Sequence, residues 1–105
     1  MATANPFILT KFRAALKELY GDRIERVVLY GSRARGDARS DSDYDVAVFL
    51  KDMADRWNEI DRIVKIEGDI LDETGAVINA LPFSAGSYNE RTPLMHEIRR
   101  EGVDV

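Results

Sequence analysis

The chain has 105 residues, of which 45% are hydrophobic and 32% charged, and its 15 basic and 19 acidic side chains leave a formal net charge of −4. These values are close to the averages for globular domains, so we expect one domain over residues 1–105, and the acidic balance argues against direct binding to nucleic acid or to anionic membranes. Without cysteine, without an apolar run near the roughly 20 residues that span a bilayer, and without a secretion-type start, the sequence predicts a cytoplasmic protein that uses neither disulfides nor thiolate chemistry.

The first predicted elements are a helix and a strand. Asn5 followed by Pro6 is typical of a helix start, and apolar residues then recur at steps of three and four up to Gly21. Residues 24–30 contain the run Val-Val-Leu-Tyr between two glycine-containing segments, which predicts a buried strand. Residues 31–42 are a polar connection in which we expect a short helical turn.

A second strand and a long helix are predicted next. Residues 44–50 end in five consecutive apolar residues, too few for a helix, so we expect a strand that is covered on both faces. Apolar residues at helical spacing predict a helix over residues 53–71, with Trp57 in its buried stripe and Gly75 as its terminator.

The last part of the chain predicts a third strand and a terminal helix. Residues 76–81 are an apolar run that ends at Pro82. The final helix extends to about Glu101, and its start has two candidates, Ser87 within a capping box or Thr92 before a proline. The order α-β-α(short)-β-α-β-α indicates the α+β class, with helices flanking a small mixed sheet of three strands or slightly more.

The connection between the first two strands carries a candidate phosphate site. A glycine and a serine at the end of a strand can present backbone N–H groups and a hydroxyl to phosphate oxygens, which makes Gly31 and Ser32 candidate ligands. Residues 33–39 hold three arginines and one aspartate, a local charge of +2. Loop arginines are common without any ligand, and we expect about half of them to contact phosphate or a partner.

Two aspartates lie at the start of the second strand. Asp43 and Asp45 are two residues apart, so their side chains leave the same face with Cα atoms roughly 6.5 Å apart. Carboxylates beside an apolar run need a positive counterpart, and Mg²⁺ held by carboxylates and substrate phosphates fits that need. The alternative is a solvated strand end whose acids pair with the loop arginines.

Other motifs are excluded by single positions. Gly31 and the glycine five residues later have the spacing of a P-loop, but Asp37 stands where its lysine is required. Aspartates at alternate positions of this loop mimic a calcium-binding EF-hand, but Val46 replaces its glycine. His96 has no second metal-ligand or nucleophile partner, so we interpret it as structural.

The motif as a whole resembles that of a known family. Gly31-Ser32, then ten residues, then Asp43-Tyr44-Asp45 is similar to the signature of the polymerase-β-like nucleotidyltransferases, and the short chain looks like their minimal nucleotidyltransferase (MNT) branch. The resemblance implies the nucleotidyltransferase fold, with Asp43 and Asp45 as catalytic residues and Mg²⁺ ligands. It also implies that Gly31 and Ser32, with Arg33 beside them, contact the triphosphate of ATP.

The sequence departs from the family at one position. Many members carry a third carboxylate on a following strand, commonly taken to activate the acceptor hydroxyl. The candidate strand here offers only Asn79, whose amide cannot accept a proton as a carboxylate can. Asp69 and Asp72 are near in sequence but belong to the end of the predicted helix.

The resemblance also implies a partner. MNT proteins are often antitoxins of HEPN-domain ribonuclease toxins, and some transfer AMP from ATP to a tyrosine of the toxin. The expected function is therefore Mg²⁺-dependent transfer of AMP to such a partner, as a type VII-like antitoxin, because 105 residues leave no room for a further domain that holds the acceptor. The alternative is a non-catalytic binding module of the same fold that neutralises its partner by contact. Whether the chain forms homo- or hetero-oligomers is left open by the sequence.

Overall fold

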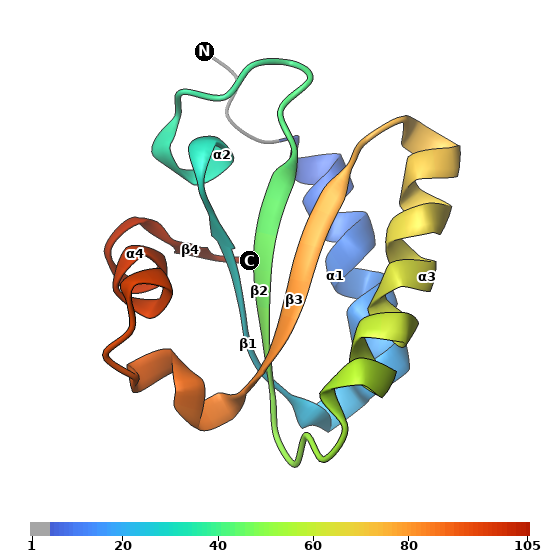
Figure 1. Ribbon diagram of the computed structural model, residues 1–105. Helices are drawn as coiled ribbons and strands as arrows, with labels where there is room; N and C mark the ends of the chain where they lie inside the picture. Colours follow the sequence, from blue (N-terminus) through green and yellow to red (C-terminus); the bar gives the residue numbers. More distant parts are fainter. Residues whose placement is uncertain (1–4) are drawn as a thin grey trace.

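The computed structural model describes residues 5–105 and places helices on both faces of one sheet (Figure 1). In chain order the elements are α1 (Pro6–Tyr20), η1 (Gly21–Arg23), β1 (Ile24–Tyr30), α2 (Ser32–Arg35), β2 (Tyr44–Leu50), α3 (Arg56–Thr74), β3 (Ile78–Ser84), η2 (Ala85–Asn89), α4 (Pro93–Glu101) and β4 (Val103–Asp104).

Four strands form a mixed sheet in the order β3-β2-β1-β4. β1 pairs antiparallel with both β2 and β4, whereas β2 pairs parallel with β3. This arrangement confirms the predicted α+β class. The strand that the sequence did not identify is β4, which has only two residues and follows the last helix.

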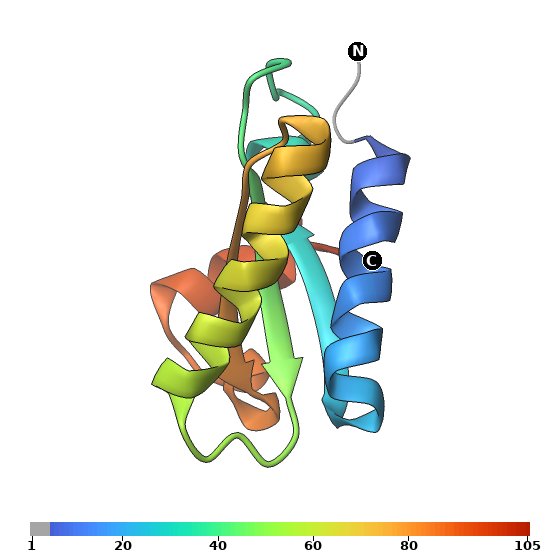
Figure 2. The same cartoon turned by 90° about the vertical axis from the view of Figure 1, so that its right-hand side faces the viewer.

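The sheet separates two hydrophobic clusters. α1 and α3 lie side by side over one face, and α4 lies over the other (Figure 2). Side chains of β2 alternate between the clusters: Val46 and Val48 join α1 and α3, and Ala47 and Phe49 join α4. The prediction that this strand is covered on both faces is confirmed. By the same alternation Asp45 lies on the α4 face.

Capping side chains define α1 and α4. Asn5 Oδ1 accepts a hydrogen bond of 2.9 Å from the N–H of Phe7, and α1 ends at Gly21, where φ is 56°. Thr92 Oγ1 accepts one of 3.1 Å from the N–H of Met95. The Thr92 start of the last helix is therefore confirmed, and the alternative start is wrong because that segment forms η2.

α3 differs from its prediction at its beginning. Asp55 caps the helix by accepting a hydrogen bond of 3.3 Å from the N–H of Asn58, so residues 53–55 lie outside it. The prediction that Trp57 is buried is wrong, because this side chain lies in the first turn on an outer flank of α3 and is largely exposed. The helix ends at Thr74, and the next residue is the predicted terminator Gly75, whose φ is 79°.

β3 continues past the predicted stop. The strand runs through Pro82 because β3 is an edge strand, where a missing N–H costs no ladder hydrogen bond. Side chains of α3 form hydrogen bonds with backbone groups of β3 instead. Arg56 Nε donates to the carbonyl of Pro82 at 3.2 Å, and the N–H of Ala80 donates to Glu67 Oε2 at 2.7 Å.

Candidate active site at the Gly31 end of the sheet

The turn after β1 is shaped to receive a carboxylate. Gly31 has a φ of 75°, and a Cβ built on it would lie 2.5 Å from Asp45 Oδ2. That distance is far below van der Waals contact, so only glycine leaves room for the Asp45 side chain at this turn. Ser32 follows directly and begins α2. The structure thus brings Gly31, Ser32 and Asp45 together.

Asp43 and Asp45 share one end of the α4 face. Asp43 precedes β2 by one residue, and its Oδ2 accepts a hydrogen bond of 2.7 Å from Asn79 Nδ2. The strand register places Asn79 beside Asp45 on one side and Tyr30 beside Asp45 on the other. The strand position that the sequence identified for a third carboxylate therefore does lie at the site, and an amide occupies it.

The electrostatics of this end favour a cation. Burial raises the pKa of the Asp45 carboxyl, and the negative charges of Asp43 and Glu97 raise it further. The Arg35 guanidinium and a hydrogen bond with Asn79 act in the opposite direction. The raised pKa means that the ionised Asp45 carboxylate lacks compensating positive charge, which a bound metal ion would supply.

The donor set fits Mg²⁺ on a polyphosphate. Within residues 5–105, no group of three or more His, Cys, Asp or Glu side chains gathers to hold a metal ion. The protein therefore offers Asp43 and Asp45, two hard oxygen donors. Mg²⁺ keeps most of its six positions for water and phosphate oxygens, so two carboxylates suffice when the substrate supplies the rest.

Arg33 is occupied with the loop that leads to Asp43. It is only 8% exposed, and its Nη2 donates to the carbonyls of Ser42 at 2.7 Å and Ser40 at 3.2 Å. Its guanidinium also stacks on the Tyr44 ring at 4.2 Å. These contacts tie the loop to the start of β2, so Arg33 fixes the position from which Asp43 emerges.

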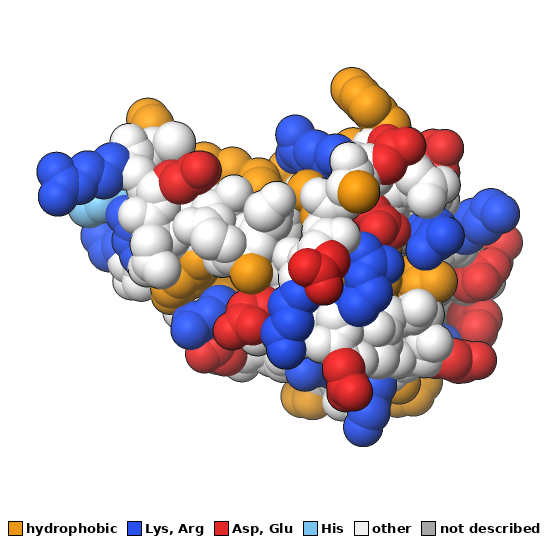
Figure 3. Space-filling view, turned by 90° about the horizontal axis from the view of Figure 1, so that it is seen from below, with side chains coloured by type: hydrophobic (Ala, Val, Ile, Leu, Met, Phe, Trp, Pro, Cys, Tyr) orange, Lys and Arg blue, Asp and Glu red, His pale blue; other side chains and the backbone are white. Residues whose placement is uncertain are grey.

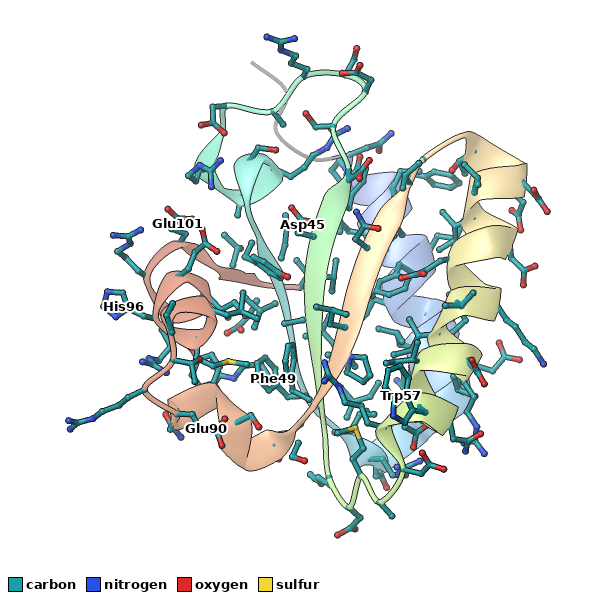
Figure 4. All side chains as sticks on the ribbon, viewed as in Figure 1. Asp45, Phe49, Trp57, Glu90, His96 and Glu101 are labelled. Atoms are coloured by element: carbon teal, nitrogen blue, oxygen red, sulfur yellow. The ribbon has the colours of Figure 1, made fainter. Side chains whose placement is uncertain are left out.

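α4 brings two further carboxylates to which the sequence analysis gave no role. Glu101 Oε1 accepts a hydrogen bond of 3.2 Å from Arg35 Nη1, and Figure 4 shows Glu101 at the same end of the sheet as Asp45. Glu97, one turn earlier, also acts on Tyr30, whose phenol pKa is raised by burial and then by Asp45 and Glu97. Their spacing of four residues was the available signal, but nothing in the sequence said which sheet face α4 covers.

The site is an open face rather than an enclosed cavity. A hollow of about 720 Å³ lies beside the same loop and is lined by Arg33, Asp41 and Tyr44, among others, but by neither aspartate of the pair. The opposite end of the molecule (Figure 3) carries intermixed acidic and basic side chains, with basic ones beside the single histidine. At the aspartate end, Asp43 is exposed and Asp45 is half-buried, so both carboxylates can be reached from solvent.

Comparison with known proteins identifies relatives over most of the chain. Residues 9–95 match the family described as nucleotidyltransferase domain. A protein of Methanocaldococcus jannaschii named as a candidate protein adenylyltransferase is 29% identical over 98 residues, which cover 93% of this chain and 95% of that protein. A second protein of the same organism, named in the same way, is 32% identical over 83 residues, covering 79% and 77%.

Solved structures show the same fold at low identity. A candidate nucleotidyltransferase of Sulfolobus solfataricus aligns with a TM-score of 0.67 and 16% identity over 93% of this chain and 76% of its own. A toxin–antitoxin complex with AMP-PNP aligns with a TM-score of 0.65 and 18% identity over 90% of this chain and 69% of its own. A tri-AMPylated HEPN toxin of Shewanella oneidensis in complex with MNT antitoxin aligns with a TM-score of 0.60 and 16% identity over 93% of this chain and 68% of its own. None of the helices in residues 5–105 has the length and apolar character needed to cross a membrane.

Proposed function

The chain belongs to the nucleotidyltransferase domain family, and on that premise we propose that it transfers AMP from ATP to a protein partner in an Mg²⁺-dependent reaction. The observation that carries the proposal is the contact of the Asp45 carboxylate with the Gly31 turn, beside Asp43. A turn open to phosphate and a pair of carboxylates suited to a cation meet at one end of the sheet. The two relatives named as candidate protein adenylyltransferases support a protein as the acceptor.

The residues of the chain position the reactants. Gly31 lets the backbone approach the triphosphate closely, and the Ser32 hydroxyl adds a rotatable donor. Asp43 and Asp45 hold Mg²⁺, which when bound neutralises charge on the triphosphate and on the leaving pyrophosphate. The acceptor hydroxyl oxygen forms a bond to the α-phosphorus and releases its proton to solvent, while the bond from that phosphorus to the oxygen bridging to the β-phosphate breaks and pyrophosphate leaves with the electron pair. Arg33, expected from the sequence to contact the nucleotide, serves the site by holding the loop before Asp43.

The partner that we propose is a HEPN-type toxin, with one of its tyrosines as the acceptor and this chain as a type VII-like antitoxin. Two of the structures with the same fold are toxin–antitoxin complexes, one with AMP-PNP and one with an AMPylated HEPN toxin. The open face above Asp45 leaves space for an acceptor side chain from another protein. We further expect the reaction in the cytoplasm, in keeping with the composition of the chain.

The direct test is label transfer from α-labelled ATP to a HEPN-type partner protein, with Mg²⁺ present. We expect transfer by the wild type and a loss of about 100-fold or more in Asp43→Asn and in Asp45→Asn, because each removes a charge that faces the cation. Asp41→Asn is the matched control, since it makes the same change on an exposed residue of the same loop. Wild-type protein that transfers no label, or transfer at the wild-type level by both aspartate variants, would refute the proposal.

One observation favours a second candidate, a binding module that neutralises its partner by contact alone. Asn79 occupies the place beside Asp45 where many family members carry a third carboxylate. In that case toxin inhibition would need no ATP and would survive in both Asp43→Asn and Asp45→Asn. Inhibition that depends on ATP and is lost in these variants would leave transfer as the function.

A further inference from the structure

α3 exposes an apolar stripe that no described element of the chain covers. Trp57, Val64 and Leu71 are 77%, 53% and 46% exposed, and each is seven residues from the next. Seven residues are two helical turns, so the three side chains form a line along the helix. Large apolar side chains in such a line expose apolar surface whose removal from water is favourable.

The stripe faces away from α1. Glu67, on the flank of α3 next to this line, reaches the edge strand β3 by accepting a hydrogen bond from the N–H of Ala80. On the other flank of α3, Glu73 forms an ion pair of 2.6 Å with Lys11 of α1. The exposed line therefore follows the β3 side of α3, at the rim of the molecule, where Figure 2 shows α3 as an outer helix.

The spacing of the stripe matches the seam of a helix pair. Asp61 and Gly68 extend it to positions 57, 61, 64, 68 and 71, which alternate steps of four and three as in a coiled coil. Gly68 has open space around the position of a Cβ, so its lack of a side chain serves no contact with the residues that the structure describes. A glycine in the seam would let a second helix approach closely at that level.

Charges along α3 indicate the direction of the second helix. Its first ten positions hold three basic residues and two acids, Arg56, Arg62, Lys65, Glu59 and Asp61, whereas its last eight hold four acids and no base, Glu67, Asp69, Asp72 and Glu73. A parallel copy would set the two acidic ends against each other, whereas an antiparallel copy sets each acidic end against the half of α3 that carries the basic residues. Antiparallel helices also bring their dipoles into a favourable arrangement.

We propose that this surface pairs with the same surface of a second copy of the chain, with the two α3 helices antiparallel about a two-fold axis at Val64. That register places Val64 against its own copy and Trp57 against Leu71 of the other chain. It also sets Asp61 within reach of Lys65 across the axis, twice by symmetry. The α4 face with Asp45 lies on the other side of the sheet and stays open in the pair.

The test is the oligomeric state over a range of concentrations, by sedimentation equilibrium. We expect a monomer–dimer equilibrium for the wild type, and Val64→Arg should raise the dissociation constant by at least about tenfold because two arginines would meet at the axis. Leu19→Arg, an equal change at a similarly exposed leucine of α1, should leave it unchanged. Val64 is exposed, so its variant should fold, as circular dichroism would verify.

A charge exchange tests the direction of the pair. Asp61→Lys and Lys65→Asp should each weaken association, and the double variant should restore it, because both cross-axis ion pairs then re-form with reversed sign. Trp57 fluorescence should shift to the red on dilution of the wild type as its indole becomes exposed. A wild-type chain that is monomeric up to its solubility limit, or a dimer unaffected by Val64→Arg, would overturn the proposal. Neither result would bear on AMP transfer, which the label assay measures separately.

Discussion

Gly31 combines a backbone conformation and a space that Asp45 needs. We expect Gly31→Ala to lower the free energy of unfolding, by about 1–2 kcal/mol for the positive φ alone, and to abolish Mg²⁺-dependent ATP binding, because the new Cβ would occupy the place of Asp45 Oδ2. Chemical denaturation measures the first effect. Isothermal titration with ATP and Mg²⁺ measures the second.

The control for Gly31→Ala is Gly21→Ala. Gly21 has a φ of 56° and a ψ of −126°, outside the left-handed helical region like Gly31 with its φ of 75° and ψ of −158°, but no atom of the described residues lies within 4 Å of its Cβ position. The two variants therefore both strain a backbone that favours glycine and differ in the clash with Asp45. Equal nucleotide affinity in both would mean that the Gly31 turn has no part in binding.

Arg33 is expected to matter through the loop that it holds. Arg33→Gln should lower the free energy of unfolding by about 2–3 kcal/mol, because the carbonyls of Ser40 and Ser42 lose a charged donor in a buried place. It should also weaken Mg²⁺ binding more than Arg39→Gln, a change at an exposed arginine of the same loop. Denaturation curves and titration with Mn²⁺ as a spectroscopic probe measure the two effects. Identical curves for the two variants would contradict this role.

The sequence predicted which residues of the candidate site lie close together through local geometry. Two aspartates two residues apart on extended backbone share a face, and a glycine at the end of a strand indicates a turn, so the positions of Asp43, Asp45 and Gly31 could be anticipated. Glu97 could not, because its place depends on which face of the sheet α4 covers. Trp57 was misplaced because helical periodicity reports a line of apolar residues but not whether another element covers it.

At the scale of elements, the outer edge of β3 is protected by side chains of α3. A free strand edge can pair with other chains, and here the polar groups of Ala80 and Pro82 are hydrogen bonded to Glu67 and Arg56. The arrangement costs energy at Glu67, since burial raises the pKa of its carboxyl and the hydrogen bond from Ala80 opposes that rise only in part.

Glu67→Gln is expected to stabilise the protein near neutral pH, because an amide oxygen can accept the same hydrogen bond without the cost of a buried charge. A raised folded-state pKa means that the native state binds the proton more tightly than the unfolded chain does. The stabilisation from protonated Glu67 is therefore complete below the unfolded-state pKa and is lost as the pH rises through the folded-state pKa. The advantage of the glutamine should shrink as the pH falls through this window, measured by urea denaturation at a series of pH values.

The matched control is Glu90→Gln, an exposed glutamate between η2 and α4. Glu90→Gln should not show the pH-dependent stabilisation expected for Glu67→Gln, because its carboxylate is not buried against β3. A Glu67→Gln variant that is less stable than the wild type at neutral pH would show that the charged hydrogen bond to Ala80 outweighs the cost of burial.

Elements with strong local signals could be predicted from the sequence, and those that depend on neighbours could not. α1 has a capping asparagine, a proline in its first turn and a terminal glycine, and it matches its predicted range. β3 was ended too early at Pro82 because the sequence does not show that β3 is an edge strand. β4 was missed because two residues carry no periodicity, and only pairing with β1 makes them a strand.

The molecule as a whole is organised around β2, whose side chains belong to both hydrophobic clusters. Neither cluster can lose its packing without exposing one face of this strand. We therefore expect residues 5–105 to unfold in one cooperative transition, in agreement with the single domain expected from the sequence. Circular dichroism in the far and near ultraviolet should give the same midpoint, and two separate transitions would contradict a single cooperative unit.

The thermal midpoint also reports whether the site binds the substrate. A ligand that binds only the native state at about 100 times its dissociation constant adds roughly 2.7 kcal/mol, which for a chain of this size raises the midpoint by about 10–20 °C. We expect this rise with ATP and Mg²⁺ together, a much smaller one with ATP alone, and none in Asp45→Asn, all at one protein concentration because self-association also shifts the midpoint. Asp41→Asn should respond like the wild type. If ATP and Mg²⁺ leave the thermal midpoint of the wild type unchanged, the aspartate pair does not bind the nucleotide. The function that then remains is neutralisation of the partner by contact alone, because that function needs no nucleotide at the pair.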